Sequence, residues 1–394
     1  MITELLREAL NDAAATVEHV RPLTGRVRRR RRWVIPAAVT ATAVTAAMAV
    51  TVISTRPGDV TRPGDVIRTN EGALPSEVPL PMKESRPPAH APTAARWTLA
   101  AYTDAKYVLV GAGTGGEPVA VNDAATGKQI AQVPVPPGST GYWDTAGAGD
   151  NRTFFLTSVD YKRAIVSFYR LRLNADGHPQ QLSELPRATL HNGLQGEGPQ
   201  LLAATNGGTK LAYVTETGAE LTITHGGSSM TDDAKIRERI HIIDPRTGEQ
   251  QAISLPQGTV IDELVWAPDG RALAFTEETP GNGLRTLDPA TGAIRHVDLG
   301  GDDGAFRAAD IGSDGDIVAL TYRADGNHLV WYSLATSKIT RDVRLEHSHT
   351  DQAVGPTIVG DAAVVVIGNT MYRVTRTSVR TRHVGHDIDL EGTW

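Results

Sequence analysis

The chain has 394 residues and a net charge of −6, and it contains no cysteine. The lack of cysteine excludes disulfides, thiolate catalysis and cysteine zinc sites, and it suits an oxidising compartment. Residues 1–33 carry +4 and residues 34–55 carry no charge, which leaves −10 for residues 56–394. Bulk electrostatics therefore exclude nucleic acid as the partner of that large part.

Residues 1–33 begin with a pattern that predicts a short amphipathic helix. Thr3 is a suitable N-cap, and Glu4 lies in the first turn, where an acidic side chain interacts favourably with the helix dipole. Apolar residues recur every three or four positions, at Leu6, Leu10, Ala13, Val17 and Val20. A lone helix has nothing of its own to cover this stripe, so we expect residues 3–20 either to lie on the membrane or to bind a cytoplasmic partner.

Residues 34–55 are an uncharged run of 22 residues that predicts a single transmembrane helix. A helix of this length rises about 33 Å, enough to cross a bilayer core of about 30 Å. Arg26 and Arg28 to Arg32 precede the run, so the Lys/Arg bias places residues 1–33 in the cytoplasm and residues 56–394 outside the cell membrane. The alternative is a signal peptide cleaved near Ala47-Met48-Ala49, but its n-region is far too long. A buried helix of a soluble domain does not explain the arginines.

Residues 56–93 have the composition of an extracytoplasmic stalk. The hexapeptide Thr-Arg-Pro-Gly-Asp-Val at 55–60 is repeated at once at 61–66, and eight prolines fall between Pro57 and Pro92. Proline fixes φ and removes hydrogen-bond donors, and the segment offers no apolar face to bury. We therefore expect an extended, semi-rigid spacer with no binding role.

Residues 94–394 alternate short apolar runs with turn residues, which is typical of an all-β domain. The clearest unit is Trp266 to Phe275, where two strands flank a Pro-Asp-Gly turn, and weaker copies follow at intervals. A second turn, with Asp at its start and Thr-Gly at its end, follows most of them. It begins at Asp123, Asp244 and Asp288, and it is degenerate at Leu334 to Lys338. In such turns Asp caps the backbone and Gly supplies the left-handed residue.

The unit from Trp266 to Phe275 resembles the blade motif of TolB-type, six-bladed β-propellers. The resemblance implies six four-stranded antiparallel sheets, with blades starting near Trp97, Gly141, Pro199, Val260, Ala305 and Gly355. A two-sheet β-sandwich is the alternative fold, and it does not explain the regular distance between the two turn types. The whole layout is similar to single-pass propeller proteins of actinobacteria. Some of those accompany extracytoplasmic-function sigma factors, but the N-terminal segment is too short for a full anti-sigma domain.

The repeat predicts that both regular turn types lie on one face of the propeller. The opposite face then receives the second-to-third loops and the crossovers between blades, which are the irregular parts of the sequence. The candidate ligand-binding residues on those loops are His191, Glu197, Asp232, Asp233, Glu277, Asp302, Asp303, His347 and His349. Clustered carboxylates there favour cationic ligands or metal, and neighbouring histidines predict pH-dependent binding.

Several motifs do not carry the chemistry that they suggest. The stretch Gly111 to Gly116 satisfies G-x-G-x-x-G, but a strand follows it instead of a helix, so we interpret it as a hairpin loop. Residues 226–230 lack the last glycine of a nucleophile elbow. His347, His349 and Asp351, and likewise the cluster at 383–389, have metal-ligand spacing but are more typical of solvated surface. The acidic pairs at 302–303 and 314–316 lack the other ligands of a calcium loop.

These patterns predict a non-enzymatic, membrane-anchored propeller that binds an extracytoplasmic peptide, glycan or protein and reports to a cytoplasmic partner. No cofactor is expected, and the sequence leaves any metal undecided. The alternative is a lactonase-like or cyclotransferase-like propeller enzyme with a metal in its central funnel.

Overall fold

The computed structural model describes most of the chain from residue 97 to residue 389 and two short segments before it. The described residues are 66–69, 77–80, 97–98, 105–111, 118–137, 139, 141–160, 163, 165–191, 200–217, 221–224, 227–230, 237–279, 283–299, 305–312, 314–323, 325–345, 353–359, 362–368, 370–383 and 388–389. The predicted N-terminal and transmembrane helices lie outside these residues. Within the described part, no helix is long and apolar enough to cross a membrane.

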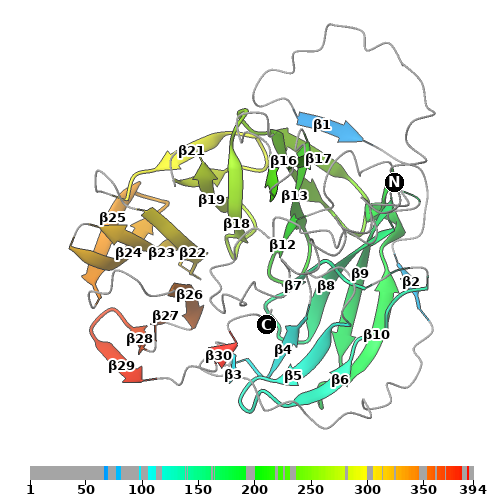
Figure 1. Cartoon of the computed structure of the whole chain (residues 1–394), viewed down its shortest axis with the longest axis horizontal. Helices are drawn as coiled ribbons and strands as arrows, with labels where there is room; N and C mark the ends of the chain where they lie inside the picture. The colour runs from blue at the N-terminus through cyan, green and yellow to red at the C-terminus, as the bar shows by residue number, and fades with distance from the viewer. Residues whose placement is uncertain are drawn as a thin grey trace, which may run out of the picture.

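Six antiparallel sheets follow one another around a ring, and each is one blade of a propeller (Figure 1). Blade 1 contains β4 (Tyr107–Val110), β5 (Ala120–Asp123) and β6 (Gln129–Gln132). Blade 2 contains β7 (Asp144–Gly147), β8 (Thr153–Asp160), β9 (Ile165–Leu173) and β10 (Pro179–Glu184). Blade 3 contains β12 (Gln200–Ala204), β13 (Leu211–Thr217), β16 (Arg237–Ile243) and β17 (Gln250–Ser254). The prediction of a six-bladed propeller is confirmed.

Blades 4, 5 and 6 each have four strands in sequence order, with the first strand innermost. Blade 4 contains β18 (Val260–Trp266), β19 (Leu273–Thr279), β20 (Leu284–Leu287) and β21 (Ile294–Val297). Blade 5 contains β22 (Ala305–Ile311), β23 (Asp316–Arg323), β24 (Gly326–Ser333) and β25 (Lys338–Arg344). Blade 6 contains β26 (Ala353–Val359), β27 (Ala362–Ile367), β28 (Thr370–Val374) and β29 (Val379–His383). The predicted blade starts at Val260 and Ala305 coincide with the first residues of β18 and β22.

The hydrophobic core lies between the blades. Five clusters of buried apolar side chains join each blade to the next, from blades 1 and 2 to blades 5 and 6. Trp266, at the end of the innermost strand of blade 4, is 5% exposed and belongs to the cluster shared with blade 3. Because a single blade cannot cover its own faces, the ring supplies the burial that each sheet needs.

The regular turns have the predicted chemistry. The Oδ1 atoms of Asp123, Asp244 and Asp288 accept a backbone N–H two or three residues ahead at 2.8 Å, and Asp269 accepts one from Arg271 at 2.9 Å. The glycines that close these turns, at 127, 248, 270 and 292, have φ between 67° and 76°. The register of β18 to β21 puts both hairpin turns of blade 4 at the same end of the sheet, as predicted.

The ring is closed by a parallel pair, β3 (Trp97–Thr98) with β30 (Ile388–Asp389). Parallel strands need a long connection between them, and here the whole propeller is that connection. The remaining elements are β11 (Leu190–His191), which pairs with β9; the hairpin of β14 (Leu221–Thr224) and β15 (Gly227–Met230); and the 3-10 helix η3 (Pro186–Ala188).

Two pieces of the predicted stalk are strands on the outer edge of the propeller. β1 (Val66–Thr69) pairs antiparallel with β17 as a fifth strand of blade 3, and β2 (Val78–Pro79) pairs with β10 as a fifth strand of blade 2 (Figure 1). Leu80 donates its N–H to Leu182 at 2.8 Å, and Glu77 forms an ion pair with Arg170 at 2.6 Å. The prediction of a free spacer therefore does not apply to β1 and β2, which pair with the propeller.

Candidate binding face

The loop face is the face of the ring that carries the second-to-third loops and the crossovers between blades. Its longest insertion, between β13 and β16, contains the separate hairpin β14–β15. Gly227 to Met230 is a strand of this hairpin, so it does not form the strand-turn-helix of a nucleophile elbow. The stretch from Gly111 joins β4 to β5, which pair antiparallel, as the hairpin interpretation requires.

Glu277 is the one predicted ligand-binding residue whose side chain lies in the described part of the chain. The backbone of His191 is described as the end of β11, but its side chain is not. The other predicted residues, Glu197, Asp232, Asp233, Asp302, Asp303, His347 and His349, lie outside the described residues. The same holds for Leu6, Leu10, Ala13, Val17 and Val20 of the N-terminal helix. Whether these groups converge on one funnel stays a prediction.

Glu277 is buried in an ion pair near the loop end of blade 4. Its side chain is 3% exposed, and its Oε1 lies 2.5 Å from Nε of Arg285 on the neighbouring strand β20. A Cβ at Gly283 would lie 3.6 Å from the other carboxylate oxygen and 3.5 Å from the ring of His296. Glu277 and His296 thus lie close to Gly283, and a ligand of Glu277 must compete with Arg285.

A second charged cluster lies at the loop end of blade 5. Asp342 contacts Arg323 at 2.5 Å and accepts a hydrogen bond from His328 Nδ1 at 2.7 Å. His328 Nε2 lies 3.0 Å from Asp325. Both ring nitrogens of His328 thus face carboxylate oxygens. The hydrogen bond from His328 holds the pKa of Asp325 below its ordinary value.

The blade 5 cluster also fixes the start of a predicted binding loop. Arg323 Nη2 donates to the carbonyl oxygen of Leu299 at 2.8 Å, and Leu299 ends the described part of blade 4. The crossover that carries Asp302 and Asp303 follows directly. The charged cluster of blade 5 therefore holds one end of that acidic crossover at Leu299.

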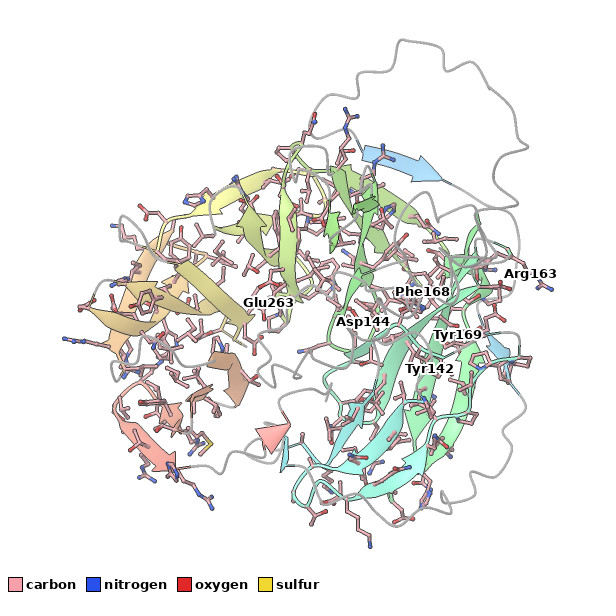
Figure 2. All side chains as sticks on the ribbon, in the orientation of Figure 1. Tyr142, Asp144, Arg163, Phe168, Tyr169 and Glu263 are labelled. Carbon is pink, nitrogen blue, oxygen red and sulfur yellow. The ribbon has the colours of Figure 1, made fainter. Side chains whose placement is uncertain are left out.

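Carboxylates also join neighbouring blades through backbone N–H groups. Asp144 of β7 accepts from Leu202 at 2.7 Å, Glu238 of β16 accepts from Ile261 at 2.7 Å, and Asp310 of β22 accepts from Ile358 at 2.8 Å. Figure 2 shows Asp144, like Glu263 of β18, on an inner strand near the middle of the ring. Enclosure of the Asp310 carboxyl group by protein raises its pKa to about 6, against the opposing effect of the N–H groups of Ile358 and Ile311.

These acidic residues were missed in the sequence because they have no motif. Asp144, Glu238 and Asp310 reach partners on another blade, so their contacts depend on which strands adjoin across the ring. Within the described residues, no group of three or more His, Asp or Glu side chains is placed to hold a metal ion. Of the histidine cluster near the C-terminus, His383 is described and is exposed at the end of β29.

Neither a family model nor a curated protein matches the chain, whereas solved structures resemble part of it. TolB from Acinetobacter baumannii is 16% identical with a TM-score of 0.43, over 73% of this chain and 65% of that one. Oligogalacturonate lyase from Vibrio parahaemolyticus is 14% identical with a TM-score of 0.45, over 81% and 86%. A puromycin-hydrolyzing peptidase of Mycobacterium tuberculosis is 15% identical with a TM-score of 0.46, over 75% and 48%. The similarity concerns the propeller architecture alone, which accompanies several functions.

Proposed function

We propose that this chain is a non-enzymatic, membrane-anchored propeller that binds a peptide, glycan or protein outside the cell through its loop face. The observation that carries the proposal is the pairing of β1 and β2 with the outer strands of blades 3 and 2. These segments lie between the uncharged run at 34–55 and blade 1. In this proposal, a tether that pairs with two blades restricts how the propeller faces the membrane, which suits display of one binding face.

The loop face is the preferred binding surface because the turn aspartates of the opposite face are engaged in capping. Asp123, Asp244, Asp269 and Asp288 each accept backbone N–H groups of their own turns. The irregular loops carry acidic residues with no turn role, Asp302 and Asp303 among them, so the expected ligand is cationic. A cytoplasmic partner at residues 3–20 would receive the signal, and the link to a sigma factor belongs to the same proposal.

The test uses the full-length protein in nanodiscs and a fluorescent lysine-rich peptide as a cationic probe. The double variant Asp302→Asn/Asp303→Asn should weaken probe binding and reduce its dependence on salt. The control Asp176→Asn/Glu249→Gln removes the same charge from exposed third-to-fourth turns on the opposite face. If the control abolishes binding and the loop variant does not, the binding face is the wrong one.

Elemental analysis of the same purified protein addresses the enzymatic alternative. One stoichiometric, tightly held calcium or zinc ion would favour a propeller enzyme over a binding protein. The double variant His347→Ala/His349→Ala then identifies the histidines as ligands if the metal is lost with it.

A further inference from the structure

The outer edge of blade 6 is an open, basic strand. β29 is the last strand in its sheet, all five of its residues are exposed, and Val379 is 46% exposed. In the described part of the chain, no strand pairs with its outer edge. Residues 362–383 contain Arg373, Arg376, Arg380 and Arg382 but no Asp or Glu. This blade is therefore strongly cationic in a chain whose propeller portion is acidic.

Three of these arginines share one face of the sheet. Arg373 of β28 lies directly opposite Arg380 of β29 in the register, and Arg382 follows two residues later. Directly opposed like charges destabilise a sheet. Among the described residues, Arg373 and Arg380 have no acidic partner that could offset the repulsion. An arginine on the edge strand alone could serve to block unwanted pairing, but Arg373 lies on the inner neighbour and does not shield the edge.

In blade 2, an added strand and an acidic side chain occupy the corresponding outer edge. Its outer strand β10 is paired by β2, and Glu77, next to β2, reaches Arg170 at 2.6 Å. Arg170 lies on β9, the third strand of its blade, opposite Ser183 of the outer strand. Arg373 has the same place in blade 6, on the third strand and opposite a residue of the outer strand. Blade 3 accepts β1 on its outer strand in the same antiparallel way.

We propose that β29 binds an extended peptide with acidic residues at alternate positions, which adds antiparallel as a fifth strand of blade 6. Alternate side chains of an added strand lie on one face, about 7 Å apart, so one carboxylate would face Arg380 and the next, in the place that Glu77 has in blade 2, would reach Arg373. Main-chain hydrogen bonds to β29 supply affinity, and the arginines select the acidic sequence. The corresponding edge of blade 5 is less suitable, because Arg341 stacks on Trp331 and Arg344 contacts Asp325. The inference does not depend on membrane anchoring or on the loop face.

The test measures fluorescence anisotropy of a labelled peptide of alternating Glu and Thr with the full-length protein in zwitterionic nanodiscs. The double variant Arg373→Gln/Arg380→Gln should bind about three- to tenfold more weakly, because two cross-strand charge pairs are lost. The control Arg295→Gln/Lys338→Gln removes equal charge from the exposed edges of blades 4 and 5 and should bind as the parent does. Equal weakening by both variants would overturn the proposed site.

A second peptide distinguishes strand addition from simple attraction of charges. It has the same sequence, with N-methyl groups on the backbone nitrogens of alternate residues, so it keeps its charge but cannot complete the ladder. Loss of its binding supports the proposal, and unchanged binding overturns it. The proposal also fails if neither peptide binds while phosphatidylglycerol vesicles bind through Arg373 and Arg380, since the basic edge would then be a lipid surface.

Discussion

The substitution Asp310→Asn probes a partly buried carboxyl group that joins blades 5 and 6. Its two oxygens accept the backbone N–H groups of Ile311 and Ile358, both at 2.8 Å, which favours the carboxylate. Enclosure by protein favours the protonated acid and prevails, since the pKa rises from 3.8 to about 6. A raised pKa means that the folded state prefers the protonated form. The stabilisation by that form is complete below the unfolded value and is lost as the pH rises through the folded value.

The size of the effect follows from linkage. With the shift from 3.8 to about 6, the folded protein should gain roughly 1.3 kcal/mol on acidification from pH 7 to pH 5. Asn does not titrate, so urea unfolding of parent and variant at both pH values should show the difference between them moving by this amount in favour of the parent. Asp144→Asn, at the analogous contact between blades 2 and 3, controls for loss of an acceptor. If the difference stays constant or moves the other way, the carboxylate remains ionised and the N–H groups outweigh burial.

Two further predictions concern stability and are measured by thermal or urea unfolding. Trp266→Ala empties a buried position between blades 3 and 4 and should lower the free energy of unfolding by about 3–5 kcal/mol. Asp269→Ala removes one turn hydrogen bond and should lower it by about 0.5–1.5 kcal/mol. Equal and negligible effects would contradict the blade assignment. Gly248→Ala should cost at least about 2 kcal/mol, because the new Cβ would lie 2.7 Å from the Cβ and carbonyl oxygen of Arg187 at a φ of 76°. Gly207→Ala has a similar φ of 77° but nothing within 4 Å, so it should cost about 1 kcal/mol; an equal cost for both would mean that Arg187 does not crowd Gly248.

The blades could be predicted from the sequence because their signals are local. An aspartate, a threonine and a glycine within five residues determine the turns that begin at Asp123, Asp244 and Asp288, and the starts of β18 and β22 follow from the apolar runs beside the regular turns. The strands β1 and β2 could not be predicted in this way. Their segment is rich in proline and poor in apolar residues, and its pairing depends on edges formed by residues more than a hundred positions away.

The charged contacts of the site escaped prediction for a related reason. Glu277 was selected as an acidic loop residue, but Arg285 lies on the next strand and the ion pair depends on the register of β19 and β20. Asp310 and Ile358 are separated by 48 residues and meet only because blades 5 and 6 adjoin. The turn chemistry needs no such information, so Asp288 was correctly assigned to capping.

The central claim is that the propeller is held outside the cell by an uncut N-terminal anchor, and protease treatment of intact cells tests it most directly. Protease should remove the propeller and leave a membrane-bound stub that contains residues 1–55, detected through an N-terminal tag. Protection of the propeller until the cells are lysed would contradict the orientation. A mature N-terminus at Val50 would contradict the anchor, because it would mean that the chain is cleaved and secreted.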